Sequence, residues 1–530
     1  MVAETIENPH AKGDAELDTD LLRDALALAF ALFVAWELYR LILYLQGLMP
    51  ALSAGFGLPY AINSWADQPL FVQIHRIAGG TAPYRPLHDA DSFTYGPIYP
   101  YLVALLDRIT ERVPTLTHLR VVAASIGLAT VVPLLVALGA LRKARAEPSA
   151  LWAFLVAGAY TVASFVFIDL RQITATSLHP DSLTFFFVLT GVAAVLWYPH
   201  TKYQSATLTV LFAACFLNAL TKLNTAPQVL FFVGALVVSR ELRIRKALWF
   251  MAFFVVGFLL VHGLEPRDMR EWTLIIPTHH ALSPLSSVLD RVTREWTVAQ
   301  PWQPLVFFGA LASLGIRVRE RPWQVTVFAI ILCGVATSGL LAWAKVGGAP
   351  NDLWMLYVVC LLPIGTCIEE ALAQPTRGSW PSIAGVAISA IFVLSLPFLA
   401  ARGAQPVAPS PEARAELAST ASQLRALCKP GRTIMVTWFA DPLIDCPGTT
   451  FPLWDSVEEI TWAGPEFAVE SLFNQPITPD AIVVIREEAF PFRLNGPYLI
   501  ARTLPVYSGS SYGYFEQHLD VWERQTQSSR

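Results

Sequence analysis

The sequence predicts an α-helical polytopic membrane protein with about 11 transmembrane helices, followed by a small α/β domain. Of the 530 residues, 54% are hydrophobic and only 15% are charged, and the mean hydropathy is +0.47. A soluble domain carries more charge than this. Apolar runs of roughly 20 residues, the length that crosses ~30 Å of hydrocarbon, recur up to about residue 400. The net charge of −4 gives no indication of a nucleic-acid partner.

The N-terminal segment sets the start of the membrane domain. Residues 1–20 are polar and acidic, and we expect a cytoplasmic tail there. The first span, Leu21–Met49, has no basic region before it and no small-residue cleavage site after it, so we predict a retained helix rather than a signal peptide. The remaining ten spans are predicted at about 119–141, 149–169, 181–198, 205–220, 225–239, 247–264, 303–316, 323–344, 352–373 and 381–400.

Basic residues gather in alternate turns between these spans. They lie at 142–145, Lys202, 240–246, 317–322 and Arg377. Lysine and arginine beside a span mark its cytoplasmic side. We therefore predict an N-terminus inside and a C-terminus outside, in a multi-pass protein of the plasma or inner membrane. The first loop, residues 50–97, is then extracytoplasmic, and Ile98–Leu106, too short to span, is expected as a re-entrant or interfacial helix.

Residues 401–530 differ in composition from the apolar part. A proline-containing linker precedes a predicted helix at 411–427 and strand-like runs at 433–438 and 481–485. We expect a small extracytoplasmic α/β domain after the membrane domain, 21–400. Cys428 and Cys446 could pair in it, because disulfides persist outside the cytoplasm.

The turns opposite the basic ones collect the unusual polar residues. They are the first loop and the segments 171–181, 221–225, 265–301 and 344–352. Ionisable residues near lipid are costly, so a cluster at one membrane face is a functional hypothesis. Aspartates with histidines can deprotonate an acceptor hydroxyl, and cationic side chains suit a phosphate leaving group. The cationic candidates are Arg85, Arg171, Lys222 and Lys345.

Several of these residues have a structural alternative. His88 and Asp89 could cap a loop, and Asp181 follows Pro180 where a helix starts, so it could be a helix cap. Asn351 could bind a sugar or cap the next helix. His279 and His280 lie in a poorly patterned loop, and we expect them at the surface.

Four blocks carry a family resemblance. DQPLFVQIHRIAGGTAPYRPLHDADSFTYGPIYPYLVALL, RQITATSLHPDSLTFFF, LNALTKLNTAPQVLFF and KVGGAPNDLW occur in this order within about residues 25–400. Together they resemble the GT-C superfamily of membrane glycosyltransferases. The resemblance implies a polyprenyl-phosphate sugar donor, a glycan, lipid or protein acceptor, and an inverting transfer on the extracytoplasmic side.

The resemblance also implies a first-loop aspartate as general base. Asp67 matches the acidic position that opens the loop, although Gln68 stands where many relatives have a second acidic residue. Asp89 and Asp91 are rival candidates. No cofactor is certain; a divalent cation is a candidate, with His88, Asp89 and Asp91 as ligands. The substrate-binding candidates are Arg85, His88, Tyr95, Arg171, His179, Asp181, Lys222, Lys345 and Asn351.

Two other functions fit a polytopic protein with a polar face. One is a transporter or flippase for lipid-linked saccharides, and the other is a ligase or polymerase that uses the same lipid carriers. A transporter is expected to show internal repeats and charges near mid-span. This sequence shows no repeat, and its polar clusters lie at one membrane face. The glycosyltransferase is therefore the favoured hypothesis.

Overall fold

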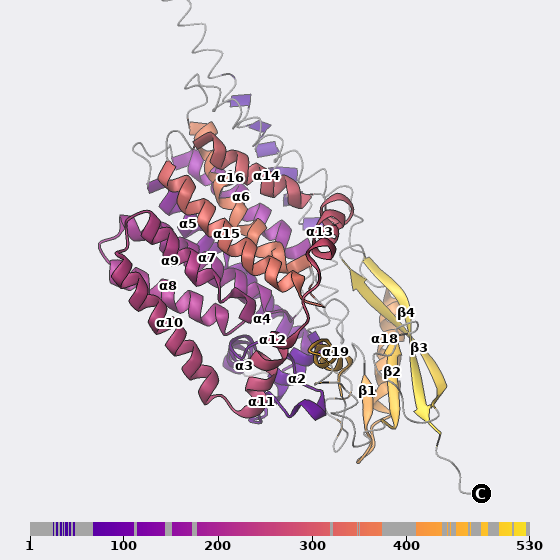
Figure 1. The fold of residues 1–530 in the computed structure, drawn as a ribbon. Coiled ribbons are helices and arrows are strands. Elements are labelled where there is room, and N and C mark those ends of the chain that lie inside the picture. The colour runs from indigo at the N-terminus through magenta and orange to yellow at the C-terminus, as the bar shows by residue number, and fades with distance from the viewer. Residues whose placement is uncertain are drawn as a thin grey trace, which may run out of the picture.

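The structure of this chain is a computed structural model. It describes residues 67–110, 114–143, 151–171, 178–300, 302–317, 322–346, 348, 350–373, 410–436, 452–464, 479–485, 498–510 and 513–525, with residues 443, 446 and 467 and separate residues of 25–47. The expected tail at 1–20 and the expected span at 381–400 lie outside the described residues. Figure 1 shows a bundle of helices with a sheet at one end.

The helical part runs from the first loop to residue 373. The first-loop elements are α2 (Asp67–Ala78) and η1 (Leu87–Asp89), and α3 (Ile98–Ile109) follows the loop. The bundle helices are α4 (Leu116–Ala129), α5 (Val131–Lys143), α6 (Leu151–Arg171), α7 (Asp181–Trp197), α8 (Gln204–Ala219), α9 (Gln228–Val238), α10 (Ile244–Leu264), α14 (Trp302–Arg317), α15 (Pro322–Ala344) and α16 (Trp354–Ala373). Short elements connect them: η2 (Tyr198–His200), η3 (Leu223–Thr225), α11 (Arg267–Arg270), η4 (Glu271–Ile275), α12 (Ile276–His279), α13 (Leu285–Arg294), η5 (Glu295–Ala299) and η6 (Pro350–Leu353).

Each span predicted between residues 119 and 373 corresponds to one or two of these helices. Five segments are long and apolar enough to cross a membrane: Leu116–Lys143, Asp181–His200, Ile244–Leu264, Pro322–Ala344 and Asn351–Ala373. Shorter apolar helices account for four further predicted spans. The described residues cover the expected spans 21–49 and 381–400 only in part or not at all, so the total of eleven spans stays a prediction; the five long apolar helices are those of an integral membrane protein.

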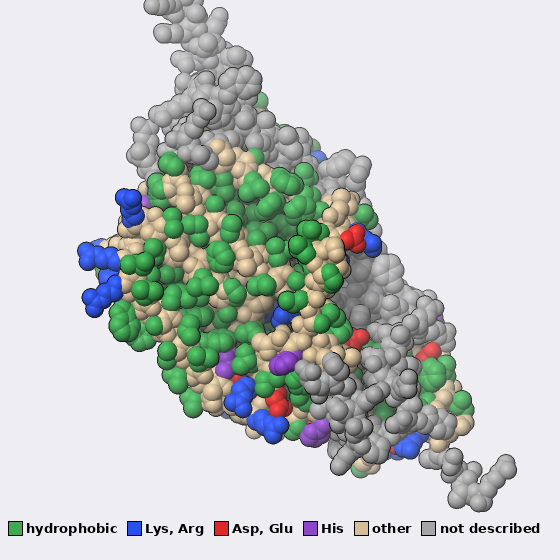
Figure 2. Space-filling model, in the orientation of Figure 1, with side chains coloured by type: hydrophobic (Ala, Val, Ile, Leu, Met, Phe, Trp, Pro, Cys, Tyr) green, Lys and Arg blue, Asp and Glu red, His purple; other side chains and the backbone are tan. Residues whose placement is uncertain are grey.

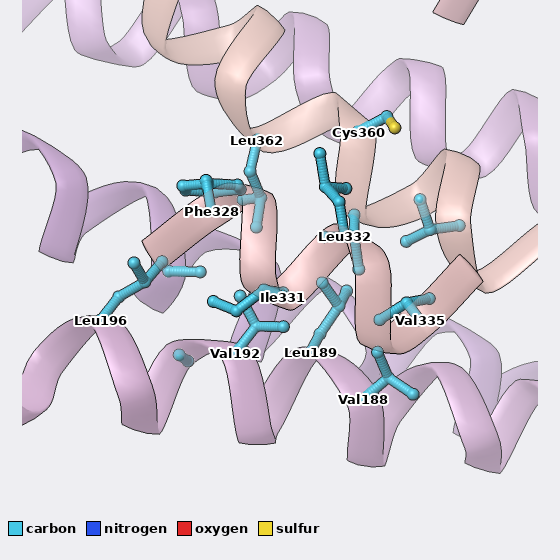
Figure 3. Close-up of a cluster of buried hydrophobic side chains, with 14 of the residues drawn as sticks. Val188, Leu189, Val192, Leu196, Phe328, Ile331, Leu332, Val335, Cys360 and Leu362 are labelled. Carbon is cyan, nitrogen blue, oxygen red and sulfur yellow. The ribbon is translucent and has the colours of Figure 1, made fainter. Parts of the chain in front are cut away.

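Helix α16 lies at the centre of the bundle. In the most apolar stretch of α16, 94% is buried inside the protein, whereas in that of α10 only 22% is buried. Helix α10 is therefore a peripheral helix that faces the bilayer. Figure 3 shows α7 and α15 packed through Leu189, Val192, Ile331 and Val335, with α16 beside them. The contacting residues of α7 and α15 are spaced three or four positions apart, which places them on one face of each helix.

The surface agrees with this arrangement. Figure 2 shows hydrophobic side chains spread over the visible face of the helical bundle, with lysine and arginine gathered at its margin. The exposed residues of α10 include Leu248, Phe253, Val256 and Leu260. In water such a patch marks an interaction site; here acyl chains cover it.

The first loop packs closely on the end of α8. Gly96 N donates to Thr221 O at 3.0 Å, and a Cβ at position 96 would lie 1.8 Å from Leu220 O. Only glycine fits such a backbone approach. The turn after Tyr95 therefore lies directly against the residue that precedes Lys222.

The C-terminal part contains two helices and a four-stranded sheet. The helices are α18 (Pro411–Arg425) and α19 (Trp454–Trp462), and the strands are β1 (Ile434–Val436), β2 (Ala481–Ile485), β3 (Tyr498–Ser510) and β4 (Gly513–Arg524). The strand order is β1-β2-β4-β3, with β1 and β2 parallel and the other pairs antiparallel. The helix and two strands expected from the sequence are present, whereas the β3–β4 hairpin was not predicted.

Side chains alternate between the two faces along a strand, and in β2 both faces are covered, because residues 481–484 are all buried. Ala481 and Val483 of β2 pack with α18. Ile482 and Val484 point the other way, into a cluster that contains Trp454 of α19. The same cluster includes first-loop residues and residues of η4 and α12, so α19 lies between the sheet and the helical part (Figure 1).

A disulfide joins Cys428 and Cys446. The two cysteines are 18 residues apart in the sequence. A disulfide that closes a loop of this size removes conformational freedom from the unfolded chain and so stabilises the folded state by about 3 kcal/mol. The disulfide links the end of α18 to the segment that leads to α19.

The first testable prediction concerns the side of the membrane on which the first loop lies. His88, whose side chain is 57% exposed, is in the first loop, and exposed Arg243 is in a basic turn. With exposed Cys333 replaced by serine, we expect His88→Cys to react with an impermeant thiol reagent on intact cells and Arg243→Cys to react only after permeabilisation. Reaction of both from the same side would contradict the topology.

Candidate functional site

A buried ion cluster lies where the first loop meets the ends of α7, α8 and α15. Lys222 Nζ donates to Asp181 Oδ1 at 2.6 Å and to Asp352 Oδ1 at 3.2 Å. All three side chains are at most 10% exposed. Burial opposes the charge of Lys222, but Asp181 and its other partners outweigh this and raise the pKa of Lys222 well above its ordinary value. Lys222 is therefore an ammonium held by two carboxylates.

An amide and two aromatic side chains complete the surroundings of Asp181. Asn351 Nδ2 donates to Asp181 Oδ2 at 2.7 Å, and His179 Nδ1 lies 3.2 Å from the same oxygen. The hydroxyl of Tyr95 is 3.2 Å from His179 Nε2. The Tyr95 ring also lies beneath the Lys222 ammonium, 5.3 Å from its centroid, which adds a cation–π contact.

The local fold explains why these residues meet. Asp181 is the first residue of α7 and follows Pro180, Lys222 is in the turn before η3, and Asp352 is in η6, which precedes α16. Gly339 of α15 allows η6 to approach, because a Cβ there would lie 2.6 Å from Asp352 O. Three chain reversals at one end of the bundle therefore converge.

A cavity of about 90 Å³ opens beside the cluster. Its charged and titratable lining residues are Tyr95, Lys222, His280, Lys345, Asp352 and Glu459. Gly348 also lines it, in a turn so tight that a Cβ would lie 2.5 Å from Ala342 O. The expected tight turn close to the cavity is therefore present at Gly348, while Gly347 lies outside the described residues.

Lys345 lies at the cavity with little compensation for its charge. In the part of the chain that the structure describes, its ammonium makes one hydrogen bond, to Pro277 O at 2.8 Å, and no ion pair. Burial lowers the pKa of Lys345, although Glu459 and Asp352 oppose this. Two of its three donor protons remain available to a ligand.

Glu459 comes from α19 of the C-terminal part and lines the same cavity. Its Oε2 accepts from Thr94 Oγ1 at 3.0 Å and lies 3.3 Å from His280 Nε2. Burial raises the pKa of Glu459 to about 8, and burial lowers the pKa of His280 to about 4. Both groups are therefore mainly neutral at pH 7.

Asp67 lies apart from this cavity. It is fully buried; Arg120 Nη2 donates to its Oδ2 at 3.2 Å, and the Leu178 N–H donates to its Oδ1. Burial raises the pKa of Asp67, an effect that Arg120 and the Leu178 amide partly offset. In this structure Asp67 anchors the backbone just before His179. Its role as base stays a prediction.

The other first-loop candidates form a separate group. Asp91 pairs with Arg76 and lies 3.7 Å from Arg85 Nη1. The half-exposed His88 lies 3.4 Å from Asp89 Oδ1, and burial and neighbouring Asp91 raise the pKa of Asp89. None of these residues lines the cavity described above.

Metal binding has no assembled ligand set among the described residues. No group of three or more histidine, cysteine, aspartate or glutamate side chains there is arranged to hold a metal ion. Arg171 is the last residue of α6, and its side chain lies outside the described part.

The structure thus unites Tyr95, His179, Asp181, Lys222, Lys345 and Asn351 from the sequence-based candidates. It adds residues that the sequence analysis missed: Thr94, Asp352, Glu459 and the Asp67 partner Arg120. It also corrects the expectation for His280, which is buried against Glu459 rather than exposed at the surface. Asp352 lies beside Asn351 in the block KVGGAPNDLW, which could have indicated it. Nothing in the local sequence indicates Glu459.

No family model and no curated protein matches the chain. Among solved structures, ArnT from Cupriavidus metallidurans bound to undecaprenyl phosphate is similar over 91% of this chain and 97% of that chain, with 12% identity and a TM-score of 0.49. The Archaeoglobus fulgidus oligosaccharyltransferase tethered with an acceptor peptide is similar over 85% and 69%, with 13% identity and a TM-score of 0.45. Both belong to the GT-C superfamily, which the sequence motifs resemble. This likeness concerns fold alone.

Proposed function

We propose that the protein is a membrane glycosyltransferase that transfers a sugar from a polyprenyl-phosphate donor to an extracytoplasmic acceptor. The observation that carries the proposal is the Lys345 ammonium, which lines the cavity beside Lys222 without a carboxylate partner among the described residues. A buried cation of this kind gains most from an anionic ligand. The motif resemblance names the ligand as the phosphate of a lipid-linked sugar.

The reaction follows from this placement of the phosphate. The acceptor hydroxyl attacks C1 of the sugar, the bond between C1 and the phosphate oxygen breaks, and polyprenyl phosphate leaves. The configuration at C1 inverts. Lys345 and Lys222 stabilise the charge that develops on the leaving phosphate, which is a common form of electrostatic catalysis.

The hydroxyl proton passes to a carboxylate within hydrogen-bond reach. We assign this role to Asp352, which lines the cavity and contacts Lys222. When the donor phosphate shares the Lys222 ammonium, Asp352 loses part of that stabilisation and becomes more basic. Asp181 holds Lys222 in place, and Asp67 positions the segment that carries His179.

Replacement of Lys345 tests the donor site. Lys345→Met keeps the length of the side chain and removes its charge, and we expect the affinity for a short polyprenyl phosphate to fall at least about thirtyfold, equivalent to about 2 kcal/mol. Isothermal titration of the purified protein measures this. Lys202→Met, in an exposed turn outside the cavity, is the matched control and should bind normally. Equal affinity in both variants would remove Lys345 from the donor site.

A second experiment separates the two candidate bases. We expect Asp352→Asn to lower the rate of transfer by about 10²–10⁴-fold with donor binding kept. Asp67→Asn leaves Arg120 buried without that carboxylate, which costs about 3–5 kcal/mol, so its loss of activity should accompany a lower unfolding temperature. An Asp67→Asn protein with native stability and donor binding but no turnover would instead identify Asp67 as the base.

A further inference from the structure

The cavity contains one acidic side chain whose presence next to a phosphate needs an explanation. Glu459 is 4% exposed as a side chain and shares the cavity lining with Lys222 and Lys345. An ionised carboxylate there would repel the phosphate of the donor. A protonated carboxyl, in contrast, can donate a hydrogen bond to it.

The geometry leaves one Glu459 oxygen for such a contact. Oε2 is engaged by Thr94 and lies close to His280. Within the described residues, Oε1 has no hydrogen-bond partner, and it is not enclosed away from the cavity. Glu459 therefore has one oxygen held by protein groups and one oxygen without a partner among the described residues, on a side chain that lines the cavity.

We propose that Glu459 is a phosphate-binding residue of this site and that its protonated carboxyl donates a hydrogen bond to the phosphate group of the lipid-linked donor. The C-terminal part thereby completes the donor site that the membrane helices begin. This inference rests on the proposed function, since it takes the donor phosphate to lie at Lys345.

The protonation state supports the geometry. Burial raises the pKa of Glu459 to about 8, although the Thr94 hydroxyl and Lys345 lower it. Because the shift is upward, the carboxyl stays protonated at pH 7 and ionises as the pH rises through about 8. A bound phosphate anion favours the protonated form further.

Other charged and titratable groups face Glu459. They are Lys345 after α15, Lys222 before η3, His280 after α12, Asp352 in η6, Tyr95 in the first loop and Glu458 on α19 itself. His280 does not titrate near pH 8, because burial lowers its pKa to about 4. Tyr95 does not titrate there either, because burial raises its pKa far above that range. Lys345 has a lowered pKa, so it is the alternative source of any loss of binding at high pH.

The test measures the affinity of the full-length protein for geranyl phosphate between pH 7 and 9.5. We expect wild-type affinity to fall by up to about tenfold per pH unit above 8, as the loss of one bound proton requires. Glu459→Gln also donates a hydrogen bond, so it should bind at pH 7 and show no such fall. If the affinity of Glu459→Gln fell in the same way, the loss of binding at high pH would come from Lys345, and the proposal would be overturned.

Two further variants keep the test decisive. Thr94→Val removes the hydroxyl that lowers the pKa of Glu459, so we expect the fall in affinity to move to higher pH; an unchanged midpoint contradicts the proposal. Glu412→Gln, which changes an exposed carboxyl of α18 outside the cavity, is the matched control and should retain the wild-type profile. If the affinity of this control variant showed no fall above pH 8, as expected for Glu459→Gln, the proposal would likewise be overturned.

Inorganic phosphate serves as the second probe. Tighter binding of geranyl phosphate than of inorganic phosphate is expected for a lipid-linked donor, and equal binding would overturn the assignment to a lipid. If the wild-type protein binds geranyl phosphate at no pH, the proposed function itself fails. If it binds and Glu459→Gln retains the wild-type pH profile, only the role of Glu459 fails.

Discussion

The buried Lys222 ammonium is the interaction on which the site depends. A lysine charge at the edge of the bilayer is tolerated only with compensating partners, and here Asp181 and Asp352 supply them from α7 and η6. Because these carboxylates come from separate chain reversals, their shared cation joins three parts of the bundle at one point. Asn351 and His179 then orient Asp181, so the position of the cavity follows from the ion cluster.

The second constraint is the contact between the membrane helices and the C-terminal part. Leu453 N donates to Ala90 O at 2.8 Å, and Ser456 Oγ donates to Ser92 O at 2.6 Å. These bonds and the apolar cluster around Trp454 place α19 against the first loop. The first loop in turn lies against Lys222 through Gly96. The part of the cavity wall that the first loop and α19 form is therefore built from segments that are distant in sequence.

The sequence could predict the parts that depend on local pattern. Apolar runs located the helices from α4 to α16, and the contrast between basic and polar turns brought Lys222, Asp181 and Lys345 to one face. It could not predict that Asp67 pairs with Arg120 or that Glu459 contacts Thr94, 365 positions away, because such pairs depend on tertiary packing. The total of eleven spans stays a prediction, and among the described helices some, such as α9 with 11 residues, have the composition of a span without its length.

The most direct measurement of the central claim is an experimental structure of the full-length protein with geranyl phosphate bound. The account predicts phosphate density in the cavity between the bundle and α19, with phosphate oxygens about 2.7–2.9 Å from Lys345 Nζ and with the Glu459 carboxyl in contact. Phosphate bound instead at the separate first-loop group around Arg85 and His88, with the Lys345 cavity empty, would contradict it.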